Sequence, residues 1–191
     1  EESLLAAQTV TGGESGITLE IPAWGSLLVV FGADTEGLAP WQPQPEYDLL
    51  AAFTDGWRIS TATAKEYPAF TETAFTCVGD LSLPDYLPDF SGTVRYERRF
   101  ALEKAEDLVL DLDDAHEAVT VTVNGTPAAE LICPPYRVAL PAALLREGEN
   151  ELVIEVTNTL VKAQNQNPFD RYFVQDPTGL ASPVRLLRAV R

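Results

Sequence analysis

Apolar and polar residues alternate along much of the chain, with a period of two residues rather than the longer period of a helix. Successive side chains of a strand point to opposite faces of a sheet, so this alternation predicts strands with one buried face. The segments of this kind beyond residue 51 are 57–63, 73–78, 93–102, 108–112, 119–123, 129–133, 136–140, 151–157 and 184–189. Many short strands separated by turns predict an all-β fold, namely an antiparallel β-sandwich or jelly roll.

The N-terminal part of the chain is organised differently. Alternation in 17–21 and an apolar run at 27–31, joined by a turn with Pro and Gly, predict a β-hairpin. The next stretch is rich in residues that interrupt strands: Gly32, Gly37, Pro40, Pro43 and Pro45. Because Pro removes ladder donors and restricts the residue before it, we interpret this stretch as a linker. The predicted division is an N-terminal hairpin extension over 1–34, a Pro-rich linker over 35–51 and a β-sandwich over 52–191.

One charged residue interrupts an otherwise regular strand pattern. In segment 93–102, Val94, Tyr96 and Phe100 supply the apolar face. Arg98 falls on that same face by strict alternation. The position therefore predicts either a β-bulge, which would turn the side chain away, or a functional charge.

Turn signals mark the ends of several predicted strands. Asn124-Gly125 directly follows the alternating segment 119–123, and both residues tolerate the positive φ angles of a tight hairpin. Evidence for helix is thin. Segment 141–146 begins with Pro, which favours the first position of a helix, and we expect a short helical stretch there.

Charge and composition narrow the function classes. The sequence carries 13 basic and 29 acidic side chains, for a formal net charge of −16. Because Lys and Arg supply the affinity for phosphates, this balance argues against nucleic-acid partners and against docking on anionic membranes. No window reaches the ~18 uninterrupted apolar residues that a membrane-spanning helix needs. The chain has no Met, which we interpret as the sign of a piece of a longer polypeptide, so secreted, cell-surface and cytoplasmic bacterial locations all stay open.

Clustered carboxylates are the first candidate chemistry. Asp111 and Asp113 share one face of the predicted strand 108–112 and its extension. A solvated face of an acidic protein explains them most simply. The alternatives are a structural calcium site, since carboxylates suit that ion, and a catalytic acid pair of the glycosidase type. We expect no other cofactor.

The cysteines and the single histidine do not form a recognisable metal site. Cys77 and Cys133 lie far apart, neither is part of a Cys-x-x-Cys pair, and His116 cannot complete a zinc set by itself. We interpret both cysteines as buried thiols, with a disulfide as the alternative. His116 is interpreted as a solvated histidine in a polar connection.

Aromatic and polar residues gather in two predicted loops. Sugars offer an apolar face and a ring of hydroxyls, so their sites combine Tyr or Trp platforms with polar hydrogen bonders. The loop at 165–173 has that composition, and so does the segment 134–137. The carbohydrate-binding candidates from these loops are Tyr136, Arg137, Arg171 and Tyr172. The alternative is that both loops simply cover an end of a sheet.

A series of motifs in order resembles a known family of domains. The motifs are F-S-G-x-x-x-Y-x-x-x-F at 90–100, L-D-L at 110–112, V-x-V-N-G at 121–125, P-Y-x-V at 135–138, G-x-N-x-L at 148–152, V-T-N at 156–158 and G-L-x-x-P-V at 179–184. Together they resemble the galactose-binding-like β-sandwich of family 2 glycoside hydrolases. They are at least as similar to the carboxyl-terminal sandwich of α-L-rhamnosidase-like enzymes of family 106.

The resemblance implies an accessory role in a larger enzyme. In these families the catalytic carboxylates lie in a separate barrel domain, so no catalytic residue is carried over to this chain. Asn158, which ends the V-T-N motif, joins the carbohydrate-binding candidates. The hairpin at 17–31 is similar to the last hairpin of a preceding β domain. We therefore expect a noncatalytic domain that packs on the parent's catalytic domain and contacts carbohydrate, with an independent carbohydrate-binding module and a self-contained glycosidase as alternatives.

Overall fold

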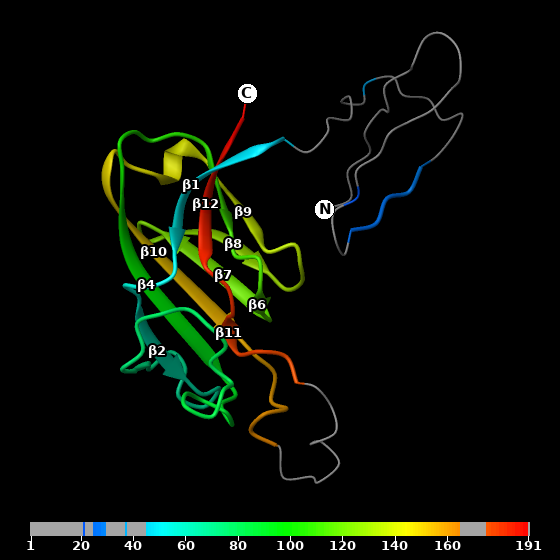
Figure 1. Ribbon diagram of the computed structural model, residues 1–191, viewed down its shortest axis with the longest axis vertical. Helices are drawn as coiled ribbons and strands as arrows, with labels where there is room; N and C mark the ends of the chain where they lie inside the picture. The colour runs from blue at the N-terminus through cyan, green and yellow to red at the C-terminus, as the bar shows by residue number, and fades with distance from the viewer. Residues whose placement is uncertain (1–20, 22–24, 30–36, 38–44, 165–174, 191) are drawn as a thin grey trace.

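The computed structural model describes residues 21, 25–29, 37, 45–164 and 175–190 (Figure 1). Its strands are β1 (Tyr47–Phe53), β2 (Arg58–Ala62), β3 (Thr71–Glu72), β4 (Thr93–Leu102), β5 (Leu108–Asp111), β6 (Ala115–His116), β7 (Ala118–Val123), β8 (Thr126–Leu131), β9 (Arg137–Leu140), β10 (Gly148–Thr157), β11 (Gly179–Leu180) and β12 (Val184–Ala189). A 3-10 helix, η1, spans Ala142–Leu144. In this part of the chain, no helix is long and apolar enough to cross a membrane.

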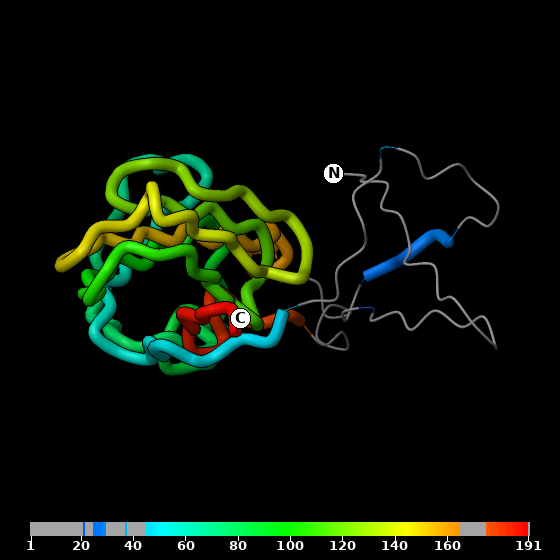
Figure 2. The backbone as a smooth tube through the Cα atoms, turned by 90° about the horizontal axis from the view of Figure 1, so that it is seen from above, coloured from blue at the N-terminus to red at the C-terminus, as the bar shows by residue number. Residues whose placement is uncertain are grey.

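The strands form two main sheets that face each other. One sheet has the strand order β1-β12-β5-β9, and the other has the order β3-β2-β4-β10-β7-β8. All their pairings are antiparallel. A short pair, β11 and β6, adds to one end. Seen from above, β1 and β12 lie on one side of the body and β10 lies on the other (Figure 2). The predicted antiparallel β-sandwich is confirmed, and the jelly-roll connectivity stays a prediction.

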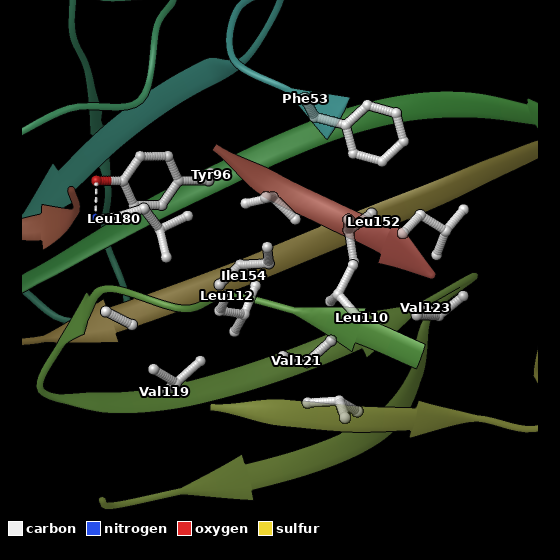
Figure 3. Packing of buried hydrophobic residues seen from close by; sticks show 14 of the residues in the cluster. Phe53, Tyr96, Leu110, Leu112, Val119, Val121, Val123, Leu152, Ile154 and Leu180 are labelled. Carbon is white, nitrogen blue, oxygen red and sulfur yellow. Dashed lines mark hydrogen bonds between the residues drawn. The ribbon is translucent and has the colours of Figure 1, made fainter. Parts of the chain in front are cut away.

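The core lies between the sheets and follows from their register. In-register residues on neighbouring strands point to the same face, so each sheet contributes rows of buried side chains. The row of the four-stranded sheet is Leu186, Leu110 and Val138, and that of the six-stranded sheet is Ile59, Tyr96, Ile154 and Val121. None of these side chains is more than 2% exposed. Figure 3 shows such side chains from β1, β4, β5, β7 and β10 meeting between the sheets.

Most predicted strands are present with small shifts at their ends, but one is wrong. Segment 73–78 is not a strand, and only Thr71–Glu72 pairs with β2 there. The segment bonds to its neighbours at separate points, from Trp57 N to Thr76 O and from Val78 N to Thr54 O, so no continuous ladder forms. The expected helical stretch at 141–146 shortens to η1.

The predicted boundary at residue 51 falls inside a strand. β1 begins at Tyr47, within the range expected to be linker, and pairs with β12 along its length. The predicted hairpin of 17–31 lies mostly outside the described residues. The positions of it that are described, 21 and 25–29, belong to no strand.

The turn after β7 forms as its sequence predicts. Asn124 and Gly125 have φ angles of 52° and 77°, and β7 pairs directly with β8 across them. The Asn124 side chain also connects this turn to β10. Its Nδ2 donates to Leu144 O at 2.8 Å and to Asn150 Oδ1 at 2.9 Å.

Candidate functional site

Of the five carbohydrate-binding candidates, the structure describes Tyr136, Arg137 and Asn158. Tyr136 is only 6% exposed, so its ring packs in the core and offers no platform to a sugar. Arg137 begins β9, and its side chain is 47% exposed. Its guanidinium carbon lies 5.8 Å from the centre of the Tyr47 ring. Arg171 and Tyr172 lie outside the described residues, so their role stays a prediction.

Asn158 holds two segments of the fold together. Its Oδ1 accepts from Gly92 N at 2.9 Å, and its Nδ2 donates to Phe90 O at 2.9 Å and to Thr178 Oγ1 at 3.3 Å. A side-chain amide has one acceptor oxygen and two donor hydrogens, so these bonds use most of its capacity. The geometry therefore favours a structural role for Asn158 over contact with a sugar.

Asp111 and Asp113 lie in an ion-pair network rather than in a vacant cage of carboxylates. Asp111 Oδ2 lies 3.2 Å from Arg137 Nε and 3.4 Å from Arg185 Nη2, and Arg185 Nη2 lies 2.9 Å from Asp113 Oδ2. The Asp111 side chain is only 4% exposed. In the described ranges, no three His, Cys, Asp or Glu side chains are grouped as a metal would need. Two arginine cations thus stand where the calcium alternative requires free carboxylates, and the geometry does not support it.

The structure corrects the interpretation of the cysteines. Cys77 and Cys133 are both exposed, and both are free thiols rather than buried side chains or partners in a disulfide. His116 lies in β6, where its Nε2 is 2.7 Å from Asp114 Oδ1. Its side chain is only 18% exposed, so the histidine is less solvated than expected.

Arg98 lies between the sheets without a bulge. The register of β4 with β10 is unbroken on both sides of it, so alternation alone directs the side chain inward. Its guanidinium carbon lies 4.3 Å from the centre of the Phe53 ring and 5.6 Å from that of Trp57. Its Nη1 donates to the carbonyl oxygen of Asp55, while its Nε is buried without a hydrogen-bond partner. Of the two predicted outcomes, the bulge is wrong.

Arg98 lines a pocket of about 350 Å³ at one edge of the sandwich. The walls are mainly apolar and come from three strands: Leu50 and Phe53 of β1, Phe100 of β4 and Leu186 of β12. The turn after β4 and the end of β12 contribute charged side chains at 103, 104, 106 and 188. A cation among mainly apolar walls is an arrangement that orients a charged ligand.

The charged residues at this pocket are largely paired with one another. Glu106 lies 3.1 Å from Lys104 Nζ and 2.5 Å from Arg188 Nη2. Hydrogen bonds from Lys104 and then from Arg188 hold the pKa of the Glu106 carboxyl below its usual value. A general acid of a glycosidase needs a raised pKa, so Glu106 has the opposite tuning.

The pocket could be predicted from the sequence only in part. Arg98 gave a signal, because it breaks the alternation of its strand. The charged residues at 104, 106 and 188 gave no such signal. They are far apart in the sequence, and the pairing of β12 with β5 and β1 brings them together.

Comparisons with known proteins extend these findings. A scan against models of protein families gives no match, and a search of curated proteins gives no relative. Solved structures do match. A rhamnosidase from Novosphingobium sp. PP1Y aligns with 94% of this chain at a TM-score of 0.68 and 24% identity, and this chain covers 19% of it.

Two further solved structures have the same kind of partial match. A GH2 beta-galacturonidase from Eisenbergiella tayi aligns with 75% of this chain and is covered to 24%, at a TM-score of 0.52 and 19% identity. A beta-glucuronidase from Ruminococcus gnavus aligns with 80% and is covered to 30%, at a TM-score of 0.54 and 16% identity. The chain thus spans less than a third of each of these three proteins. At these identities the likeness establishes a shared β-sandwich fold, and the exact domain family stays a prediction.

Proposed function

We propose that this chain is a noncatalytic accessory domain of a larger glycoside hydrolase and that it packs against the catalytic domain of that enzyme. The observation that carries the proposal is the match to the Novosphingobium rhamnosidase, which takes in nearly all of this chain but about a fifth of the enzyme. The same relation to two other glycosidases supports it. Glu106, whose pKa is lowered, lacks the raised pKa of a catalytic acid, and both oxygens of the acid-pair candidate Asp111 lie in a network with two arginines.

The outer face of the four-stranded sheet is the surface that suits such packing. Leu186 and Leu110 face the core, so their neighbours Leu187 and Val109 face outward. Register extends this outward row to Leu49 on β1 and to Ala139 on β9. The row therefore crosses the whole sheet with apolar side chains. Leu49 is 59% exposed, whereas Leu187 is only 7% exposed, so the accessible part of the row lies toward the β1 edge.

Beside this apolar row, the same outward face carries the ion pairs of Asp111 with Arg137 and Arg185. The outer face of the six-stranded sheet carries ion pairs as well. Its ion pairs are Arg58–Glu72, Arg58–Glu97, Arg95–Glu155 and Arg99–Glu149. Exposed charges of this kind are well solvated and gain little from a partner. The apolar row of β1, β12, β5 and β9 supports the four-stranded sheet as the side that contacts the catalytic domain.

Contact with carbohydrate is the second part of the proposal, and it rests on fewer residues than the sequence predicted. Tyr136 is buried and Asn158 is occupied, which leaves Arg137, Arg171 and Tyr172 as the candidates. Retention on immobilised glycans tests this part, by comparing the chain with its Arg137→Ala and Tyr172→Ala variants. Equal retention of all three proteins would discard these residues as sugar ligands.

The natural full-length polypeptide tests the main proposal. We expect it to hydrolyse a glycoside from a panel of nitrophenyl glycosides, while the 191-residue chain alone does not. A chain that is active by itself, or a natural polypeptide without a second domain, would refute the proposal.

A pair of variants tests the packing face separately. Leu49→Lys should lower the midpoint of thermal inactivation of the full-length enzyme, because burying a Leu side chain contributes about 1.5–3 kcal/mol. The matched control is Val153→Lys on the outer face of the six-stranded sheet, which should change little. Equal effects of the two substitutions would contradict the choice of face and leave the accessory role intact.

A further inference from the structure

Arg98 is a cation that the described structure leaves without a counterion. None of the ion pairs among the described residues includes it. Its partners are the carbonyl oxygen of Asp55 and the faces of Phe53 and Trp57. Carbonyl and aromatic contacts offset part of the cost of removing a charge from water, but they do not neutralise it.

The unused edge of this guanidinium has a definite chemical preference. Because Nη1 is bound to Asp55, the edge that remains is formed by Nε and Nη2. In the described part of the chain, Nε has no partner although it is buried. Nη2 is not buried in this way, so it can donate directly to an oxygen of a carboxylate, and the parallel N–H of Nε joins it when the side chain turns that edge toward the ligand.

The pocket beside Arg98 adds the requirement for an apolar body. Its walls are formed by Leu50, Phe53, Phe100 and Leu186, and a volume of about 350 Å³ lies at the small end of the range for ligand pockets. Inorganic anions would use the charge but leave these walls without contact. A neutral apolar molecule would fill the walls and leave the charge unpaired.

Electrostatics in the pocket favour an anion even though the chain is acidic. Its charged lining consists of Arg98, Lys104 and Arg188 against Glu103 and Glu106, so cations outnumber carboxylates. Since the whole chain has a formal net charge of −16, this is a local reversal of sign. Such a reversal inside a cleft attracts anions more strongly than an open surface does.

We propose that this pocket binds a small organic carboxylate whose compact apolar body packs between β1, β4 and β12 and whose carboxylate pairs with Arg98. The lining of this pocket includes none of the carbohydrate-binding candidates and none of the residues of the outward apolar row. The inference does not depend on the proposed accessory function, because it uses only residues of the sandwich itself.

Calorimetric titration of the 191-residue chain with phenylacetate tests the site. Acetate carries the charge without the apolar body, and 2-phenylethanol carries the aromatic body without the charge. We expect saturable binding of phenylacetate at one site, at least tenfold tighter than that of either comparison compound. Absence of saturable binding, or equal binding of all three compounds, would overturn the proposal.

Two variants assign the binding to this pocket. Arg98→Met should weaken phenylacetate binding at least tenfold, whereas Arg99→Met should leave it unchanged, because Arg99 is the next residue of β4 and faces the opposite side. If Arg98→Met fails to fold, Leu50→Trp is the second test. Leu50 is 38% exposed and lines the pocket, so an indole there should block binding while the fold is kept. Unchanged binding in either folded pocket variant would refute the assignment.

Discussion

The hydroxyl of Tyr96 makes one buried hydrogen bond whose loss can be measured cleanly. It accepts from Leu180 N at 3.0 Å, and both side chains are fully buried (Figure 3). Tyr96→Phe removes only the hydroxyl, and the space left is smaller than the volume that a water molecule needs. The Leu180 N–H is then buried without a partner, which costs about 1–3 kcal/mol. A domain of this size should lose roughly 4–8 °C in Tm for the middle of that range.

Urea unfolding followed by the fluorescence of buried Trp57 measures this loss. The control is Tyr86→Phe, because Tyr86 is 45% exposed and its hydroxyl should matter little. A loss below about 0.3 kcal/mol for Tyr96→Phe would refute the reasoning, because it would mean that Leu180 N finds another acceptor.

A second substitution tests the same contact from its other side. A Cβ at Gly179 would lie 2.0 Å from the Tyr96 hydroxyl oxygen but 3.2 Å from the ring carbon that carries it. Gly179→Ala should therefore be strongly destabilising, in part because φ is +85° there. Tyr96→Phe should relieve the steric part, so the double variant loses less than the sum of the two single losses. Additive losses would show that the hydroxyl is not the atom that excludes a side chain at Gly179.

Further predictions concern pH, the candidate site residues and Arg98. Burial raises the pKa of the Tyr96 hydroxyl in the folded chain above its unfolded value of about 10. The stability that the neutral hydroxyl contributes is therefore complete below pH 10 and falls as the pH rises above 10. Urea titrations should show that the difference in unfolding free energy between the unmodified chain and Tyr96→Phe narrows above pH 10. Asn158→Ala should cost about 2–3 kcal/mol, because Gly92 N and Phe90 O both lose a partner, and a loss near zero in the same assay would contradict its structural role. Asp111→Asn should cost about 1–2 kcal/mol, and EDTA should leave the Tm of the unmodified chain unchanged; a fall in Tm with EDTA would restore the calcium alternative. Arg98→Met should leave the free energy of unfolding unchanged or raise it, and a loss above about 2 kcal/mol would mean that the cation stabilises the fold.

The strands were predictable where period two coincides with burial on one face. In β4 and β7 the alternating residues are the ones that the opposite sheet covers, and the predicted bounds agree to within one residue. Segment 73–78 alternates as well, but it lies beside β2 at the edge, where irregular bonds replace the ladder. Strands β6 and β11 have two residues each, which is too short for an alternating pattern. They are strands because they pair with each other across a long sequence separation.

The candidate site was predictable only where a single residue broke a rule. Residue types typical of sugar sites pointed to Tyr136 and Asn158, yet the first fills the core and the second holds a loop. Composition cannot separate these uses, because aromatic rings and amides serve folding and binding with the same chemistry. Arg98 was different, since a charge on a buried face conflicts with local packing, and conflicts of that kind occur at functional positions.

That conflict can be weighed energetically. Arg98 gains one hydrogen bond to Asp55 and contacts with two aromatic rings, which together contribute about 2–4 kcal/mol. Against this, the side chain is partly withdrawn from water without a paired charge, and its buried Nε has no partner among the described residues, which costs free energy. A Met side chain would fill similar space without removing a charge from water and without leaving a buried N–H group unpartnered. The contacts within the described residues therefore leave Arg98 without a paired charge, and a carboxylate in the adjoining pocket would supply it.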